Sequence, residues 1–281
     1  MSSLKKNIIW LASYPKSGNT WIRIFLANYL SNSNQPIDVN NIDVSTISSA
    51  RADFDTFSGV LSSDLTADEI DLFRPDIYKN IAESEDNVVF IKTHDANHTN
   101  TNNIPLFPEE VTLGVVHIIR NPLSVVPSYA HHFSFSIDEA IDALNNDENK
   151  LSFSIKKLTK QLRQQLFSWN QHFESWQQTK SPYLLIRYED LKVNPYETFK
   201  QLLLFIYKEV DEERLKKAII FSDFKQLKSQ EQKASFKEKP IKSESFFRKG
   251  NLDSWKEELT EKQAQQIIKN HKKIMCDLNY L

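Results

Sequence analysis

The sequence predicts an α/β fold in a single domain, with a central, mainly parallel sheet flanked by helices. Two observations predict it: apolar, β-branched runs alternate with helical patterns along the chain, and each such run ends directly in polar residues. Strands separated by helices favour a parallel sheet, which binds ligands at the carboxyl ends of its strands. Because the 281 residues hold no internal repeat and no Gly/Ser-rich linker, we expect one domain over 1–281.

The expected strands are short and apolar. The first, at 7–14, holds the run IIWL and stops at the polar loop 15–19. The segments VVFIK at 88–92 and LGVVHII at 113–119 are β-branched and bounded by polar turns, and YLLIRY at 183–188 has the same character. Each of these strands should therefore deliver polar residues to the same edge of the sheet.

The expected helices follow the strands. An apolar repeat predicts a helix over 20–30, and a second helical pattern at 66–83 is broken near Pro75, because proline removes a backbone hydrogen bond. Pro122 suits the first turn of a helix over 122–133. Further helical patterns lie at 137–145, 153–178, 195–207, 211–221 and 260–276. The polar stretch 31–63 is expected to be loop with short helical turns, and 225–245 to be mobile.

Composition limits the function classes. The 35 Lys and Arg residues and 37 Asp and Glu residues give a formal net charge of −2, so no overall field favours nucleic acid. The single cysteine, Cys276, cannot form an internal disulfide, which indicates a reducing compartment. The apolar run at 8–11 is too short for a signal peptide or a membrane span. The sequence thus predicts a cytoplasmic protein without a membrane span.

The octapeptide YPKSGNTW at 14–21 lies between the first strand and the first helix. Backbone N–H groups at a helix start, the hydroxyls of Ser17 and Thr20, the Lys16 ammonium and a glycine that permits close approach can together hold a phosphate. The segment lacks the GxxxxGK[ST] pattern of an ordinary ATP-binding loop. Taken alone, it also fits an ordinary turn with a helix cap.

This octapeptide resembles the 5′-phosphosulfate loop, usually YPKSGTTW, of cytosolic-type sulfotransferases that use 3′-phosphoadenosine 5′-phosphosulfate (PAPS). The resemblance, to a bacterial-like member of that family, implies a fold similar to P-loop kinases and the product 3′,5′-adenosine bisphosphate (PAP). It implies that Lys16 bonds the bridging oxygen of the leaving group and that Trp21 lies on adenine. The residues it assigns to the 5′-phosphate are Ser17, Gly18, Asn19 and Thr20, of which only Asn19 departs from the usual motif.

Two further segments are similar to family motifs for the rest of the nucleotide. Arg120 ends a strand and Ser128 lies two turns into the next helix, so both can reach one anion; the resemblance assigns them to the 3′-phosphate. The segment FFRKG, followed by Trp255-Lys256, resembles the family's C-terminal RKG…WK element. By that likeness the remaining nucleotide contacts are Arg248, Lys249, Gly250, Tyr188, Phe224 and Ser222, although Tyr188 and Phe224 also fit a core role.

The catalytic base is expected in VFIKTH, where a strand delivers His94 to its carboxyl end beside Lys92. Histidine titrates near neutrality and can take a proton from a hydroxyl. The match to the family's KTH motif implies His94 as base and Lys92 near the transferring group, and the chain continues with Asp95-Ala96-Asn97 where the family often has Leu-Pro. His131 and His132, near the predicted phosphate-binding helix at 122–133, are interpreted as structural or acceptor-lining.

The expected reaction is an in-line displacement at sulfur. His94 removes the proton of a small hydroxylated acceptor, and Lys16 with Lys92 neutralises charge building on the transferring group. No cluster of carboxylates at ligand spacing lies near the loop, so no metal is predicted. Two alternatives stay open: a P-loop-like kinase for a nucleoside or small alcohol, and a non-catalytic protein that binds adenosine bisphosphate.

The acceptor site and the oligomeric state are the least determined features. Loops at 31–63, 94–107 and 131–155 are expected to line the acceptor pocket, with an apolar contribution from Phe133, Phe135 and Phe153. The family's dimer motif, KxxxTVxxxE, is only partly present, as Lys256, Thr260, Glu261 and Gln265. A homodimer is therefore left open.

Overall fold

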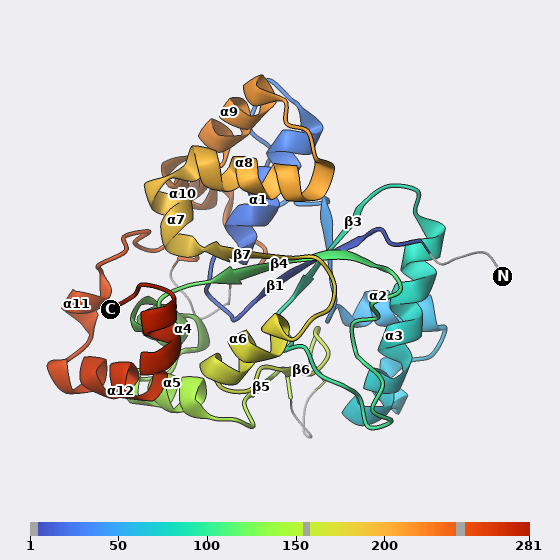
Figure 1. Cartoon of the computed structure of the whole chain (residues 1–281), viewed down its shortest axis with the longest axis horizontal. Helices are drawn as coiled ribbons and strands as arrows, with labels where there is room; N and C mark the ends of the chain where they lie inside the picture. Colours follow the sequence, from blue (N-terminus) through green and yellow to red (C-terminus); the bar gives the residue numbers. More distant parts are fainter. Residues whose placement is uncertain (1–4, 154–157, 240–244) are drawn as a thin grey trace. The chain divides into compact units, whose positions relative to one another are not determined.

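The computed structural model describes residues 5–153, 158–239 and 245–281, and Figure 1 shows the order of its helices and strands. The chain forms two compact units. Unit 1 comprises Met1–Tyr14, Ser45–His117 and Asp147–Leu185, and unit 2 comprises Pro15–Val44, Ile118–Asn146 and Ile186–Leu281. The chain passes from one unit to the other several times.

A five-stranded sheet has the strand order β2-β3-β1-β4-β7. Its strands are β1 (Ile8–Ser13), β2 (Ser45–Ile47), β3 (Val89–Thr93), β4 (Thr112–Ile119) and β7 (Tyr183–Arg187). β3 pairs in parallel with both β1 and β2, in the register that places Ile8 opposite Val89. The predicted α/β class and four of the strands are confirmed. β2 was not predicted, because its three residues, Ser-Thr-Ile, are too few and too polar to give a strand pattern.

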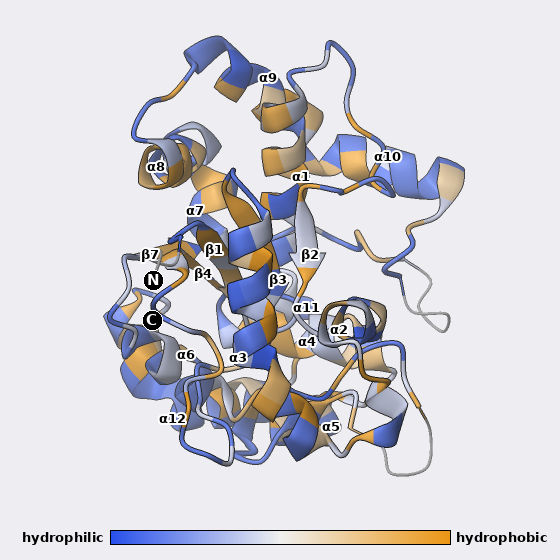
Figure 2. Cartoon of the chain, turned by 90° about the vertical axis from the view of Figure 1, so that its right-hand side faces the viewer, coloured by the Kyte–Doolittle hydropathy of each residue, from blue (hydrophilic) through white to orange (hydrophobic). Residues whose placement is uncertain are grey.

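Helices and short elements complete unit 1. They are α2 (Arg51–Ser58), the 3₁₀ turn η1 (Ser62–Asp64), α3 (Ala67–Ser84), α6 (Trp169–Gln177) and the two-stranded pair β5 (Lys150–Leu151) with β6 (Gln164–Gln165). Trp10 of β1 packs edge-on against Tyr78 and Phe107, each with ring centroids 4.8 Å apart. Burying such rings removes a large apolar area from water, which fixes α3 on the sheet. Hydrophilic and hydrophobic residues alternate along α3 in Figure 2.

Pro75 does not break α3, contrary to the prediction, because the helix continues through it from Ala67 to Ser84. A proline leaves the carbonyl four residues earlier without its helical partner. Here that carbonyl belongs to Asp71, and it accepts a hydrogen bond from the Asn100 side-chain amide at 3.3 Å. A side chain distant in sequence therefore replaces the lost helical bond.

The long helix predicted at 153–178 is wrong over most of its length. Within the described residues of that range, a helix exists only at 169–177, and β6 precedes it. The apolar residues Leu162 and Leu166 in this range are buried, but they lie in extended chain and not in a helix. Ser168 begins α6 by accepting a hydrogen bond from the Gln171 N–H, so a local cap overrides the apolar repeat upstream. Residues 154–157 of the predicted helix lie outside the described residues.

Unit 2 is helical. Its elements are α1 (Asn19–Ser31), α4 (Pro122–Phe133), α5 (Ile137–Asn145), α7 (Tyr188–Val193), α8 (Pro195–Tyr207), α9 (Glu212–Phe221), α10 (Phe224–Ala234), α11 (Trp255–Glu258) and α12 (Glu261–Asp277). Phe25 of α1 stacks on Phe199 of α8 with centroids 3.8 Å apart, and α12 packs against α4 and α5 (Figure 1). The helices predicted at 20–30, 122–133, 137–145, 195–207, 211–221 and 260–276 are confirmed.

α10 corrects the prediction of a mobile segment at 225–245. Asp223 caps this helix by accepting from the Lys225 N–H, and Leu227 is buried. The helix is polar along most of its surface, so its few core residues gave no clear sequence signal. Residues 240–244 of the predicted segment lie outside the described residues.

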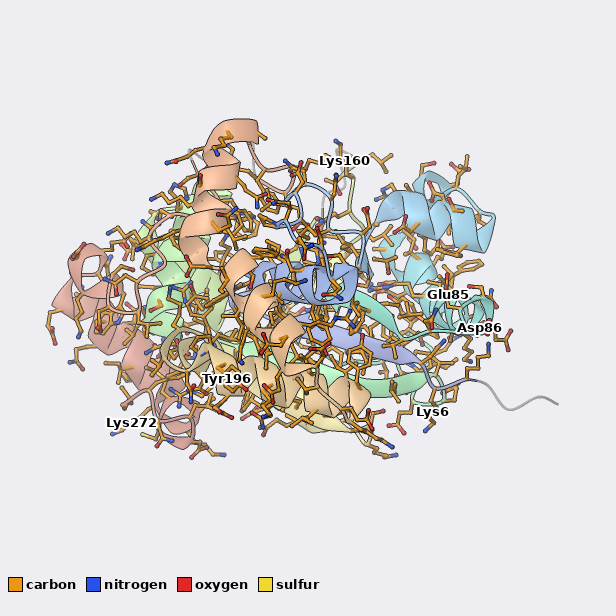
Figure 3. The ribbon with its side chains drawn as sticks, turned by 90° about the horizontal axis from the view of Figure 1, so that it is seen from above. Lys6, Glu85, Asp86, Lys160, Tyr196 and Lys272 are labelled. Carbon is orange, nitrogen blue, oxygen red and sulfur yellow. The ribbon has the colours of Figure 1, made fainter. Side chains whose placement is uncertain are left out.

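Charged side chains cover the outer faces. In Figure 3 the labelled side chains of Lys6, Asp86 and Lys160 lie at the periphery, and all three are exposed. Among the described helices, not one combines the length and the apolar character that crossing a membrane requires.

Candidate active site

The loop 15–18 leads from β1 into α1 and has an unusual backbone. Lys16 has φ 70° and Gly18 has φ 107°, values that are strained for most residues. The Gly18 carbonyl accepts hydrogen bonds from the N–H groups of Trp21 and Ile22 at 2.9 and 3.4 Å, so α1 starts here. The first N–H groups of the helix have no helical partner and can face an anion.

Polar side chains at this loop are buried and suit a phosphate. Ser17 is 1% exposed, and its hydroxyl has no hydrogen-bond partner among the described residues. Asn19 and Thr20 are also buried. A buried hydroxyl left unpaired costs about 1–3 kcal/mol, so the loop favours a ligand that supplies an acceptor. The residues present therefore fit the 5′-phosphate group that the sequence predicted.

Arg120 lies beside this loop. Its Nη1 donates a hydrogen bond to the Lys16 carbonyl at 3.2 Å, and its guanidinium lies 4.4 Å from the centroid of the Tyr188 ring. Its Nε is buried and has no partner within the described part of the chain. The structure thus brings Arg120, Tyr188 and the loop together, as the sequence predicted.

Glu189 supports this arrangement and was missed by the sequence reasoning. Its Oε1 accepts the Asn121 N–H at 3.0 Å, while the Asn121 side chain caps α4 by accepting the Leu123 N–H. The carboxylate therefore fixes the turn next to Arg120. The only available signal was its place directly after Tyr188 in the segment RYED.

The C-terminal element 246–252 contacts the same part of unit 2. Ser124 of α4 donates to the Leu252 carbonyl at 3.0 Å, and the Lys16 ammonium lies 4.1 Å from the centroid of Phe246. Glu231 of α10 accepts the N–H groups of Phe246 and Phe247 at 2.6 and 2.9 Å. A single buried carboxylate therefore anchors the start of the FFRKG segment.

Two glycines each lie under an aromatic ring. A Cβ on Gly18 would lie 2.7 Å from the Tyr188 ring, and a Cβ on Gly250, where φ is 63°, would lie 2.7 Å from the Phe224 ring. Both distances are shorter than carbon atoms tolerate. Both sites therefore require glycine for space as well as for backbone conformation.

The predicted adenine contacts Trp21 and Phe224 lie around one cation. The Lys192 ammonium is 5.5 Å from the Trp21 ring centroid and 5.3 Å from that of Phe224. Burial lowers the pKa of Lys192. Two serines were also predicted to contact the nucleotide. Ser222 is fully buried, and its hydroxyl donates to the Ala218 carbonyl at 2.7 Å. Ser128 on α4 is partly exposed.

Arg248 and Lys249 are paired with carboxylates. Arg248 makes a two-pronged ion pair with Glu258, with nitrogen–oxygen distances of 2.5 and 2.8 Å. The Lys249 ammonium lies 3.2 Å from Glu257 and 3.4 Å from Glu258. The sequence reasoning did not identify Glu258 as a neighbour of the predicted 3′-phosphate residues.

His94 lies in unit 1, just beyond β3. Its Nδ1 is 2.7 Å from the Ser13 carbonyl oxygen and 3.2 Å from the Ser13 hydroxyl. Because a carbonyl can only accept, Nδ1 carries the hydrogen and Nε2 carries the lone pair. This tautomer is the one a general base needs. Lys92, two residues earlier on β3, is 8% exposed.

His172, in SWNQH of α6, is a further neighbour of His94 that the sequence reasoning missed. Its Nε2 lies 3.2 Å from the His94 carbonyl, and its ring centroid is 5.6 Å from that of His117. Burial lowers the pKa of His172 to about 3 and that of His117 well below its ordinary value. Both imidazoles are therefore neutral in the folded protein at neutral pH.

These buried histidines predict a loss of stability in acid. Between pH 6.5 and 3 the unfolded chain binds a proton at His172 that the folded chain does not, so the free energy of unfolding falls as the pH falls. The slope is about 1.4 kcal/mol per pH unit for each such histidine. His172→Asn should reduce the slope by about that amount in urea titrations between pH 6 and 4. An unchanged slope would contradict the assignment.

Metal ligands do not gather at this site. Within 5–153, 158–239 and 245–281, no group of three His, Cys, Asp or Glu side chains could hold a metal ion. The predicted lack of a metal requirement stays a prediction.

The family model "Sulfotransferase domain" matches residues 6–278. This chain belongs to the sulfotransferase family. The flavonol 3-sulfotransferase of Flaveria bidentis is 25% identical over 276 residues, which are 94% of this chain and 80% of that protein. Sulfotransferase 1B1 of Mus musculus is 26% identical over 279 residues, 95% of this chain and 82% of the relative.

Solved structures share the fold. The mouse sulfotransferase SULT7A1, complexed with PAP, superimposes with a TM-score of 0.60 at 19% identity, covering 96% of this chain and 84% of that one. A retinol dehydratase with retinol and PAP gives 0.61 at 17% identity, covering 97% and 82%. The prediction of a sulfotransferase enzyme is confirmed. The kinase alternative is set aside, because the family model covers nearly the whole chain.

Proposed function

We propose that this sulfotransferase transfers the sulfuryl group of PAPS to the hydroxyl of a small acceptor and releases PAP. His94 acts as the general base through Nε2, while the Lys16 ammonium stabilises charge on the leaving phosphate and Lys92 neutralises charge on the transferring group. The nucleotide lies with its 5′-phosphate on the loop 17–20 and its 3′-phosphate at Arg120, Ser128 and the segment 248–250. A flavonol 3-sulfotransferase among the relatives suggests phenolic hydroxyls as the first acceptors to assay.

One observation carries the proposal. In unit 2, Arg120 donates to the Lys16 carbonyl at 3.2 Å, so the residues assigned to the two phosphates meet at one place. Beside them lie the Ser17 hydroxyl, which is buried without a partner among the described residues, and two glycines that let the rings of Tyr188 and Phe224 approach the backbone closely. Such a cradle suits an anion with two phosphate groups.

The test is turnover of radiolabelled PAPS with quercetin, 4-nitrophenol and a steroid alcohol as acceptors, in excess chelator. We expect a sulfated product from at least one acceptor. Calorimetry should give PAP binding much tighter than ATP binding. PAP binding without transfer to any acceptor would favour the non-catalytic alternative, and equal binding of PAP and ATP would contradict the nucleotide assignment. Activity that disappears with the chelator would contradict the absence of a metal requirement.

Glu258 gives a separate prediction at the 3′-phosphate site. Its carboxylate occupies the donors of Arg248 that the phosphate would use, and it repels an incoming anion. Glu258→Gln should therefore raise PAP affinity about 3–10-fold at low salt, because surface electrostatic effects are modest and screened. Glu257→Gln, which alters only an exposed partner of Lys249, is the matched control. Weaker PAP binding in Glu258→Gln would mean that the carboxylate orients Arg248 instead.

The proposal also covers the domain organisation, the location and the partners of the protein. A single domain over 1–281 is supported by the family model, which spans residues of both units. A cytoplasmic location, the absence of nucleic-acid partners and the bacterial-like character of the chain remain predictions from the sequence. A homodimer is still open: Thr260 caps α12, and Lys256 pairs with Asp253 at 2.9 Å.

The acceptor side is proposed to be partly apolar. Phe133 lies 4.4 Å from Tyr129 and 6.1 Å from Phe135, measured between ring centroids. Phe135 is 43% exposed, and an exposed ring beside Phe133 would favour a flat aromatic acceptor. Phe153, which the sequence also assigned to the acceptor site, is 56% exposed in unit 1.

A further inference from the structure

Asp95, the residue directly after His94, is buried with a charged partner inside unit 1. Its Oδ2 accepts a hydrogen bond from Arg74 Nη2 at 2.7 Å, and its Oδ1 accepts the Gln165 N–H at 2.8 Å. Asp95 and Arg74 are each 1% exposed. An ion pair is therefore enclosed immediately beside the candidate base.

The pair is part of a balanced network. Arg74 Nη1 also lies 3.1 Å from Asp71 Oδ1, and Asp71 in turn pairs with Arg163. Arg163 reaches exposed Asp68 at 2.6 Å. Burial opposes the charge of Arg74, but the fields of Asp95, Tyr78 and Asp71 outweigh it and raise its pKa well above the ordinary value. Arg74 thus stays charged in the core.

Stability alone does not explain such a pair. Two charges lose their hydration on burial, and well-packed apolar residues of similar volume are commonly as stable. The charged pair must therefore contribute something that packing does not.

What it contributes is a fixed backbone around His94. The Asp95 N–H donates to Thr93 Oγ1 at 3.1 Å, and the Asp95 carbonyl accepts from Trp176 Nε1 at 3.0 Å. The Ala96 N–H donates to the Gln165 carbonyl at 2.7 Å. Together with the hydrogen bond from the Gln165 N–H to Asp95 Oδ1, it joins the two segments in both directions. The Asp95 carboxylate links this turn to α3, through Arg74.

We propose that the buried Asp95–Arg74 pair is a positioning element that holds His94 with Nδ1–H on the Ser13 carbonyl and Nε2 toward the acceptor hydroxyl. The inference rests on the proposed function, in which His94 is the base. A displacement of about 1 Å at a reacting group can cost up to about 100-fold in rate. Asp95 acts through His94 and not on the substrate.

The test uses two variants and one control in the full-length enzyme. Asp95→Asn keeps an oxygen for the Gln165 N–H and removes the charge. The double variant Arg74→Met with Asp95→Asn removes both charges and leaves the Asp71–Arg163 pair intact. It holds no buried arginine that has lost its partner, so it should fold even where Asp95→Asn alone does not. Asp68→Asn is the matched control, because it removes a carboxylate from the exposed end of the same network.

The measurements are kcat and KM for PAPS with the acceptor found in the panel, PAP binding, and the tautomer and titration of His94 by nitrogen-15 NMR. In both variants we expect kcat to fall about 10–100-fold, with KM for PAPS and PAP binding within about twofold of wild type. The His94 signals should shift from the single Nδ1–H form to a mixture, and Asp68→Asn should change neither. The inference would be overturned if the nitrogen-15 signals of His94 matched those of wild type, or if the folded double variant kept the wild-type kcat. The NMR result is independent of turnover, so it separates this failure from a failure of the proposed function.

Discussion

His94→Ala is expected to lower kcat about 100–10,000-fold while PAP binding stays within about twofold of wild type. The reason lies in the tautomer: Nδ1 donates to the Ser13 carbonyl at 2.7 Å, which leaves the lone pair on Nε2 to take the acceptor proton. No other imidazole carries out this role in the proposed mechanism. The measurement is steady-state turnover of PAPS with the phenol that the panel identifies.

Two controls accompany this variant. Thermal unfolding should be close to that of wild type, because His94 is only half-buried and its removal leaves the Ser13 carbonyl able to bind water. Added imidazole should restore part of the rate, since it returns the same kind of base to the space left by the ring. Full turnover in His94→Ala would remove His94 from the mechanism.

Gly18→Ala should both destabilise the protein and weaken PAP binding about tenfold or more. The alanine would have to adopt φ 107° with its Cβ 2.7 Å from the Tyr188 ring. Such a backbone conformation costs about 1–3 kcal/mol, and the ring must move in addition. The Arg120 guanidinium lies on the face of the Tyr188 ring, so a movement of the ring should also displace Arg120 at the proposed 3′-phosphate site.

Gly59→Ala is the matched control for this substitution. Gly59 also has a positive φ, 68°, but nothing lies within 4 Å of its added Cβ. It should cost only the backbone strain, about 1–2 kcal/mol, with PAP affinity unchanged. Urea unfolding and calorimetry measure the two effects. Equal PAP affinity in both variants would show that the Gly18 contact has no part in nucleotide binding.

Much of the fold was predictable, since the four longer strands are apolar runs with sharp polar ends. The errors came where distant contacts override local pattern. Asn100 replaces the bond that Pro75 removes, and the Ser168 cap starts α6 late in an apparently helical repeat. β2 is held by pairing with β3 rather than by its own composition.

The candidate site was predictable where one short segment carries it. The loop at 14–21 and the histidine after β3 could be proposed from the sequence because the residues of each motif are neighbours in the chain. Glu231, Glu258 and Asp95 could not, since each acts on a segment that is distant in sequence or through a partner on another element. Carboxylates at such places are indistinguishable in sequence from exposed ones.

The side-chain amide of Asn100 has a consequence for the choice of acceptor. Asn100 donates to the Asp71 carbonyl and accepts the N–H groups of Asn102 and Ile104, while the Asn97 N–H donates to Ser175 Oγ. The stretch after His94 has therefore lost most of its conformational entropy on folding, before any acceptor binds. A preorganised binding surface gains affinity for the molecule it fits and adapts poorly to others, so in the proposed acceptor site, which includes this stretch, we expect a narrow range of acceptors.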